Sequence, residues 1–184
     1  MVSGSEPIKF PYNRDKAIQV ALWLLNRHGG TLDRLKLVKL IFFADRKHLA
    51  RYGKPIVGGN YCAMKFGPVP SEFLDDLNKA QKKGTFPFES ATTNKVYTNV
   101  QPNEELLSES DIKILEMVDK NYGRLDPFKL AKITHALKAW EKNYPNPNDN
   151  TSYPLPYEDF FLDEEDDSML EIIKDDQEAW IGFE

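Results

Sequence analysis

Histidine and cysteine are the residues of this sequence best suited to catalysis or metal binding, but their spacing supports neither. His28, His48 and His135 lie far apart, and none is three to five residues from another histidine or from the single cysteine, Cys62. Zinc sites use ligands at such short spacings or several thiolates, so we expect no bound metal. The sequence also lacks a glycine-rich phosphate loop, a dinucleotide fingerprint and a Gly-x-Ser-x-Gly turn, so we expect no cofactor and no catalytic residue.

Two enzymatic alternatives stay open at this point. One is a Cys62 nucleophile paired with His135, and the other is an enzyme that uses Asp45, His48 or His135. The spacing supports neither beyond chance, and a lone cysteine suits a small apolar position in a strand. We therefore expect a protein that acts by binding.

A group of basic residues on one predicted helix suggests where it binds. At 100° per residue, the helix expected over residues 31–52 has two apolar sides and one polar sector, so it should pack between neighbours. This basic sector consists of Lys36, Lys39, Arg46 and Lys47 around Phe43. Cations around an exposed aromatic suit an acidic protein surface or nucleic acid. The alternative is a solvated cationic face with Phe43 covered by another element.

Asp45 is the one acid within an apolar arc of the same helix. A buried carboxylate requires a partner, either a cation such as arginine or a set of backbone amides. We expect a structural ion pair.

The remaining patterns predict a mainly α fold of about five helices with a small antiparallel β-hairpin, in a single compact domain. Asn13, Ser108 or Ser110, and Asp126 before Pro127 are good helix-starting signals. Between the helices, residues 60–65 suit a short strand or an ordered loop. The expected helices span residues 13–27, 31–52, 71–82, 108–122 and 126–140, and the hairpin pairs 86–89 with 95–100.

Composition agrees with a globular protein that crosses no membrane. Hydrophobic residues make up 41% of the 184 residues, which is enough for a core. The longest apolar run, residues 20–25, is far shorter than the roughly 20 residues of a membrane span. The first residues have neither a basic nor an apolar secretion signal, so we expect a cytoplasmic protein.

Charge is distributed unevenly along the chain and suggests a globular part over residues 1–157 and an acidic tail over residues 158–184. The tail has twelve acidic residues and one base, Lys174, whereas the preceding residues have a net charge of +6. Such a run usually only solvates a chain, but here it could also screen the basic sector or mimic phosphate for a basic partner. Phe160, Phe161, Trp180 and Phe183 favour docking of the tail on its own body or on a partner.

Two neighbouring segments resemble a known family. Lys39-Leu40-Ile41-Phe42-Phe43-Ala44-Asp45 leads to Gly53-Lys54-Pro55, and Tyr61 to Ser71 then contains Lys65-Phe66-Gly67-Pro68-Val69. This pattern resembles the Panacea domain of SocA-like antitoxins from bacteria and phages, as does Thr134-His135 five residues ahead of Trp140. The resemblance extends from about residue 14 to 161. It implies structural roles for the motif residues Asp45, Gly53, Gly67, Pro68, Thr134, His135 and Trp140.

The resemblance also implies a function. Members of the family neutralise a toxin encoded beside them, generally by direct protein–protein contact, in toxin–antitoxin systems that include phage defence. The toxins are of many unrelated kinds, so the resemblance does not identify the toxin. The resemblance leaves two alternatives open, an adaptor that delivers the toxin to a protease and a nucleic-acid-binding regulator of its own operon. A pI near 5.3 and the lack of a helix-turn-helix extension oppose the second.

Overall fold

The computed structural model describes residues 6–146, 148 and 150–181, and these form seven α-helices and two small antiparallel sheets. The predicted mainly helical class with a small antiparallel component is confirmed, whereas the expected number of about five helices is too low. The elements are α1 (Arg14–Arg27), β1 (Thr31–Asp33), α2 (Arg34–Tyr52), β2 (Tyr61–Met64), β3 (Gly67–Pro70), α3 (Ser71–Lys79), β4 (Glu89–Ser90), β5 (Lys95–Tyr97), η1 (Glu104–Leu106), α4 (Glu109–Tyr122), α5 (Pro127–His135), α6 (Lys138–Asn143), β6 (Tyr153–Leu155), η2 (Tyr157–Phe161) and α7 (Ser168–Ile181).

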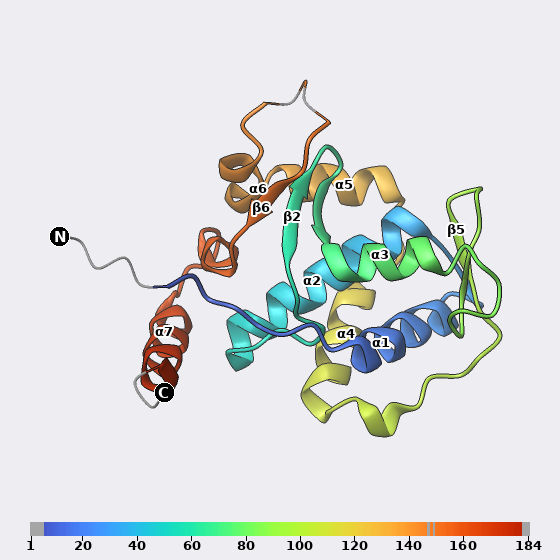
Figure 1. Ribbon diagram of the computed structural model, residues 1–184, viewed down its shortest axis with the longest axis horizontal. Coiled ribbons are helices and arrows are strands. Elements are labelled where there is room, and N and C mark those ends of the chain that lie inside the picture. The colour runs from blue at the N-terminus through green and yellow to red at the C-terminus, as the bar shows by residue number, and fades with distance from the viewer. Residues whose placement is uncertain (1–5, 147, 149, 182–184) are drawn as a thin grey trace.

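Helix α2 is the central element, as its two apolar sides predict. It lies between α1 and α4 on one side and α5 with β3 on the other (Figure 1). Leu37, Leu40 and Ile41 are fully buried on it. Gly53 ends the helix in the left-handed region, with φ 76°, as a glycine at this position allows. Burial from several directions explains why the sequence of α2 is apolar on more than one face.

The start of α2 differs from the prediction because residues 31–33 are extended. They form β1, which pairs antiparallel with β5 so that Leu32 faces Val96. Asp33 then caps the helix by accepting from the backbone N–H groups of Leu35 and Lys36. Pairing with β5 keeps Thr31 in the sheet, so the next capping residue in the sequence begins the helix.

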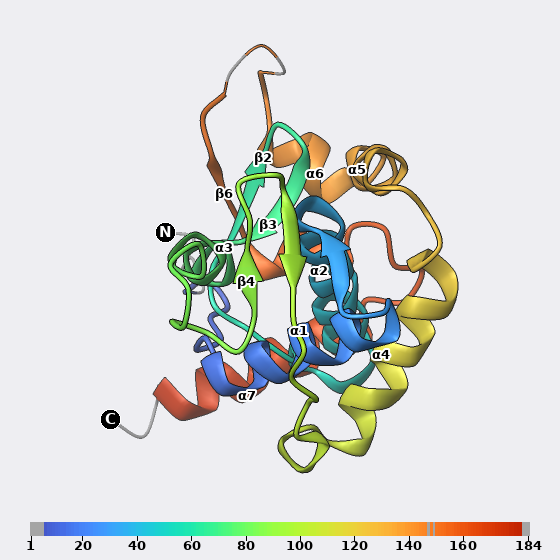
Figure 2. The same cartoon turned by 90° about the vertical axis from the view of Figure 1, so that its right-hand side faces the viewer.

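The predicted hairpin is present with shorter strands than expected, and residues 60–65, for which a strand or a loop was open, contain a strand. Strands β4 and β5 form the expected hairpin, whose turn has Asn94 at φ 61°, and the hairpin stands beside α3 (Figure 2). The segment 60–65 contains β2, the middle strand of the order β3-β2-β6. Cys62 lies in β2, opposite Val69 of β3, as its small apolar character suggests.

The helix expected over 126–140 is broken in two. Asp126 caps α5 and Pro127 is its first residue, as predicted, but α5 ends at His135. Leu137 is extended, with ψ 131°, and α6 begins after it. The break turns Trp140 back toward His135, a contact that a straight helix would not allow at this spacing.

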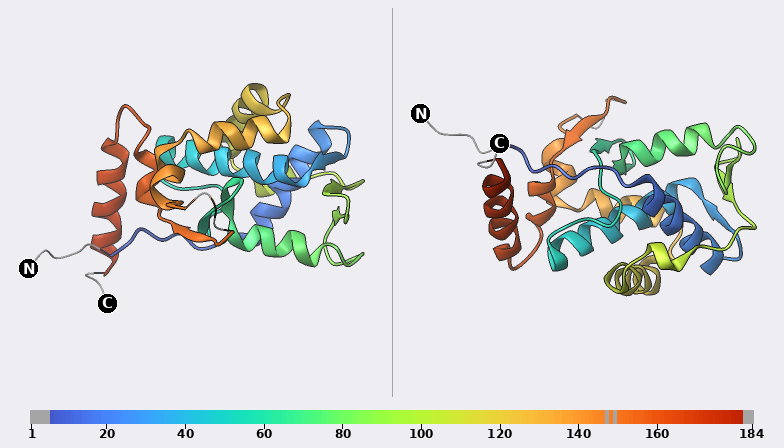
Figure 3. Two further views of the ribbon diagram at one scale, coloured as in Figure 1. Left: turned by 90° about the horizontal axis from the view of Figure 1, so that it is seen from above. Right: turned by 60° about the horizontal axis from the view of Figure 1, so that its bottom comes forward.

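The C-terminal residues pack on the body in two steps. Tyr157 to Phe161 form η2, whose Phe160 and Phe161 side chains are buried in the core. Helix α7 follows after the acidic residues 163–167 and lies at one end of the molecule (Figure 3). Its Ile173 is buried. The side chain of Trp180 and all of Phe183, for which docking was also expected, lie outside the described part of the chain.

None of the helices in the described residues combines the length and the apolar character that a membrane span requires.

Candidate functional site

The predicted exposed basic sector does not exist as one surface. Lys39 is 0% exposed and Phe43 is 4% exposed, so the prediction that Phe43 is an exposed binding residue among cations is wrong about its exposure. Phe43 stacks on Tyr122 of α4, with 4.2 Å between ring centroids, so the alternative of a covered aromatic describes it. Helical periodicity gives the direction in which each side chain points but not which element lies there. Helix α4 packs against the side of α2 that carries Phe43.

The other members of the sector are separated along α2. Lys36 is partly buried near the start of the helix, and burial lowers its pKa below the ordinary value. Arg46 and Lys47 lie two to three turns further on and face the acidic residues after Leu162. The structure therefore does not bring these cations together at one contact.

Lys39 lies beneath strand β3 and holds it. Its Nζ donates to the carbonyl of Pro68 at 2.7 Å, and burial lowers the pKa of the amine to about 7. Gly67, with φ 100°, passes so close that a Cβ at this position would collide with Thr134 Oγ1 and approach Lys39 Nζ to 2.9 Å. Thr134 itself donates to the carbonyl of Ala131. Motif residues about seventy residues apart in the sequence thus meet at one buried cluster.

His135 and Trp140 hold the other end of the same hairpin. Their rings stack with 4.0 Å between centroids, and Trp140 Nε1 donates to the carbonyl of Met64 at 2.8 Å. His135 hydrogen-bonds to the backbone of Lys65, its Nε2 is buried without a partner, and burial lowers its pKa. We name residues 64–67 the braced turn, because buried or partly buried side chains of α2, α5 and α6 support it from below.

Asp45 has a different partner from the one expected. Instead of an ion pair, its carboxylate accepts from the backbone N–H groups of Ile56, Val57 and Gly58 at 2.8–3.1 Å and from Tyr61 Oη at 2.9 Å. Complete burial raises the pKa of Asp45 to about 6, while the four hydrogen bonds act in the opposite direction. Asp45 therefore fixes the loop after Gly53, which leads into β2.

The residues considered for catalysis form contacts within the fold, and His48 Nε2 also lies 3.3 Å from Asp111 Oδ1. His48 is fully buried; its ring contacts the carbonyl of Lys54 at 2.6 Å and the hydroxyl of Ser110 at 3.1 Å. Cys62 accepts from Ser71 Oγ at 3.1 Å. Among the described residues, no group of three or more histidine, cysteine and acidic side chains is placed to hold a metal ion.

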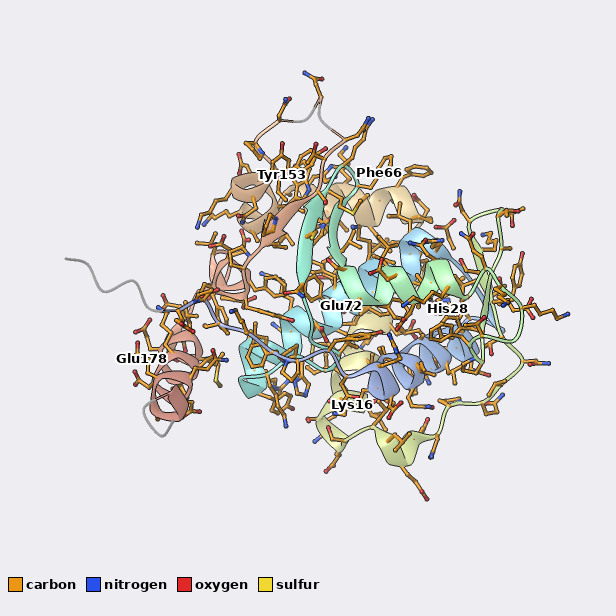
Figure 4. All side chains as sticks on the ribbon, in the orientation of Figure 1. Lys16, His28, Phe66, Glu72, Tyr153 and Glu178 are labelled. Atoms are coloured by element: carbon orange, nitrogen blue, oxygen red, sulfur yellow. The ribbon has the colours of Figure 1, made fainter. Side chains whose placement is uncertain are left out.

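The braced turn forms one wall of an apolar groove that the sequence did not reveal. The groove has a volume of about 560 Å³ and lies between the start of α2, α3, the braced turn and the start of α5. Phe66 of the braced turn is 51% exposed and Phe128 of α5 is 71% exposed (Figure 4 labels Phe66 at the edge of the molecule). Arg34 and Lys65 add positive charge to the lining, whereas Asp33 is already engaged as the cap of α2. The sequence signal for these two residues was their position: Phe128 follows the helix-starting Pro127, and Phe66 precedes Gly67-Pro68. Neither position belongs to an apolar stripe.

Exposed aromatics on a rigid support are typical of a protein-binding surface. Large apolar side chains in solvent have an energetic cost unless a partner covers them, and aromatic residues dominate the binding energy of many interfaces. Because the turn that carries Phe66 is hydrogen-bonded from beneath, little order has to be gained when a partner docks.

The state of Lys39 leads to a prediction about stability and pH. Between pH 7 and 10.5 the amine binds a proton in the unfolded chain but not in the folded one, so the free energy of unfolding should rise with pH, by up to about 1.4 kcal/mol per unit. Urea denaturation at pH 7.5, 8.5 and 9.5 measures the slope, and Lys39→Met should remove most of it. Lys113→Met, at an exposed lysine, is the control and should leave the slope unchanged. An unaltered slope in Lys39→Met would show that the buried amine stays charged.

Comparison with known protein families gave a match. The family model described as antitoxin SocA-like, Panacea domain, matches residues 37–141. Comparison with curated proteins and with solved structures gave no significant match. The matched region covers more than half of the chain and includes most of α2, the braced turn, Thr134 and Trp140. The chain therefore belongs to the Panacea-domain family of SocA-like antitoxins.

Proposed function

We propose that this protein is an antitoxin that neutralises a protein toxin by binding it directly, with the apolar groove between the braced turn and α5 as the contact surface. The observation that carries the proposal is the exposure of two aromatic side chains, Phe66 and Phe128, in the lining of the same groove. The family supports an antitoxin role and hence a toxin partner. In this proposal the protein acts by occluding the toxin and not by a reaction of its own.

The groove indicates the kind of toxin surface that it accepts. Its apolar lining suits aliphatic or aromatic side chains, and Arg34 with Lys65 suits carboxylates beside them. Asp33 adds little repulsion, because its carboxylate accepts two backbone N–H groups. We therefore propose an apolar segment with acidic neighbours as the part of the toxin that docks.

The test combines neutralisation with binding. Phe66→Ser with Phe128→Ser should weaken the complex with the toxin encoded by the adjacent gene at least about tenfold and abolish growth rescue, because the truncation of an anchoring aromatic typically costs 2 kcal/mol or more. The melting temperature should change little, since both side chains are exposed. Tyr97→Ser, at an aromatic that is 45% exposed outside the groove, is the control and should keep full affinity.

Three outcomes would contradict the proposal in different ways. Full affinity of the double variant would move the contact surface elsewhere. Rescue without any complex, together with chemical reversal of the toxin's product, would indicate an enzyme. Rescue that requires a cellular protease, with loss of toxin protein, would favour the adaptor alternative over occlusion.

A further inference from the structure

The last two turns of α2 form a second surface, which the groove does not include. Arg46, Lys47 and Arg51 lie there, and residues 163–167, the acidic segment, cross in front of them. Arg46 Nη2 is 2.9 Å from Glu164 Oε1, and the two side chains are only 14% and 20% exposed. A cavity of about 590 Å³ lies between Lys47 and Arg51 on α2 and the acidic segment.

The contact between the two is incomplete. Glu164 reaches one edge of the Arg46 guanidinium, while the Nε of Arg46 is buried and has no hydrogen-bond partner. A guanidinium binds a carboxylate best through two parallel hydrogen bonds. Within the described residues, neither Lys47 nor Arg51 forms a salt bridge. The surface therefore has more capacity for carboxylates than its present occupant uses.

The acidic segment is anchored on both sides, independently of Arg46. At its first residue, Asp163 Oδ2 accepts from the backbone N–H of Lys138 at 3.0 Å. After it, α7 is held by buried Ile173 and by Gln177, whose Nε2 donates to the carbonyl of Lys9 at 3.0 Å. These anchors keep the segment near the cations even when the ion pair opens, as a tether keeps a weak ligand at high effective concentration.

We propose that the C-terminal end of α2 is a binding surface for an acidic peptide segment of a protein partner, and that the chain's own acidic segment occupies it as a displaceable competitor. The present occupant is itself a short run of carboxylates on a peptide. The next exposed acids on α7, Glu171, Asp175 and Asp176, would repel a long polyanion that extends past the surface, such as duplex DNA. A short acidic peptide avoids them.

The experiment uses the full chain and a fluorescein-labelled octaglutamate peptide, with binding followed by anisotropy at low salt. The test variant, Glu164→Gln with Glu165→Gln and Asp166→Asn, removes the competing charge and should bind the peptide about tenfold more tightly than the unaltered protein. Arg46→Gln with Lys47→Gln in the same background should abolish the gain. Glu164→Gln alone should give a smaller gain in the same direction, which keeps the test valid if the triple variant folds poorly.

A matched control separates competition from net charge. Asp175→Asn with Asp176→Asn and Glu178→Gln removes the same charge from α7, away from the cavity, and should change the affinity for the peptide less than threefold. Equal gains in both triple variants would overturn the proposal, because a general charge effect would then explain them. If the triple variant still binds the peptide more tightly when Arg46 and Lys47 are also replaced, these residues do not form the binding site. Tighter binding of a DNA duplex than of the peptide would overturn the class of partner.

Discussion

Replacing Asp45 by alanine is expected to destabilise the protein by more than about 3 kcal/mol. The carboxylate accepts hydrogen bonds from three consecutive backbone N–H groups, at residues 56–58, and from Tyr61 Oη. Each buried donor that is left without a partner costs about 1–3 kcal/mol, and the four cannot all find replacements in an apolar interior. Since domains of this size are stable by about 5–15 kcal/mol, the loss should be visible as a large shift of the urea midpoint.

Two milder variants show whether the network is the cause. Asp45→Asn keeps one acceptor oxygen and should lose less stability than the alanine variant. Tyr61→Phe removes one of the four donors without leaving another unpaired and should cost only about 1 kcal/mol. Similar losses in all three variants would mean that the ring of Tyr61 or the general packing, and not the carboxylate, determines stability here.

Gly67→Val is expected to have an effect of comparable size, on the order of 3 kcal/mol or more. At φ 100° a β-branched residue is strained by about 1–3 kcal/mol, and the new Cβ would also strike Thr134 Oγ1 and press on Lys39 Nζ. Neither neighbour can move freely, because Thr134 donates to Ala131 and Lys39 donates to Pro68. Thermal melting and urea denaturation measure the loss.

Gly84 provides the control for the backbone strain alone. It also has a positive φ, 80°, but a Cβ at this position would meet nothing within 4 Å. Gly67→Ala should therefore cost at least about 2 kcal/mol more than Gly84→Ala, and the difference measures the collision. Equal losses would show that the braced turn moves aside to accept a side chain. An unchanged melting curve with lost neutralisation would instead place Gly67 in the contact surface.

The motif residues of the family therefore support the proposed binding surface more than they form it. Lys39, Thr134 and His135 are largely covered, yet all of them lie against the hairpin that carries Phe66. A toxin contact at the groove would thus depend on residues that the toxin does not touch. Binding measurements on Gly67→Ala would test this dependence, since the variant alters the support and leaves Phe66 in place.

Local features of the fold were predictable from the sequence alone, because each depends on residues close together in the chain. Asn13, Ser108 and Asp126 accept from backbone N–H groups two or three residues ahead, which is a property of a few neighbouring residues. Gly53 ends α2 for an equally local reason. The hairpin around Asn94 follows from turn-forming residues between two short strands.

What covers each side chain was decided only by the tertiary structure. The periodicity of α2 correctly indicates a helix between neighbours, but it places Lys39 and Phe43 in a polar sector that β3 and α4 in fact cover. The break between α5 and α6 likewise follows from the contact of Trp140 with Met64, which is remote in the chain. Phe66 and Phe128 line the same groove although about sixty residues separate them in the sequence, so no local sequence pattern predicts the groove. Spacing along one element fixes only directions, whereas burial depends on which elements pack along those directions.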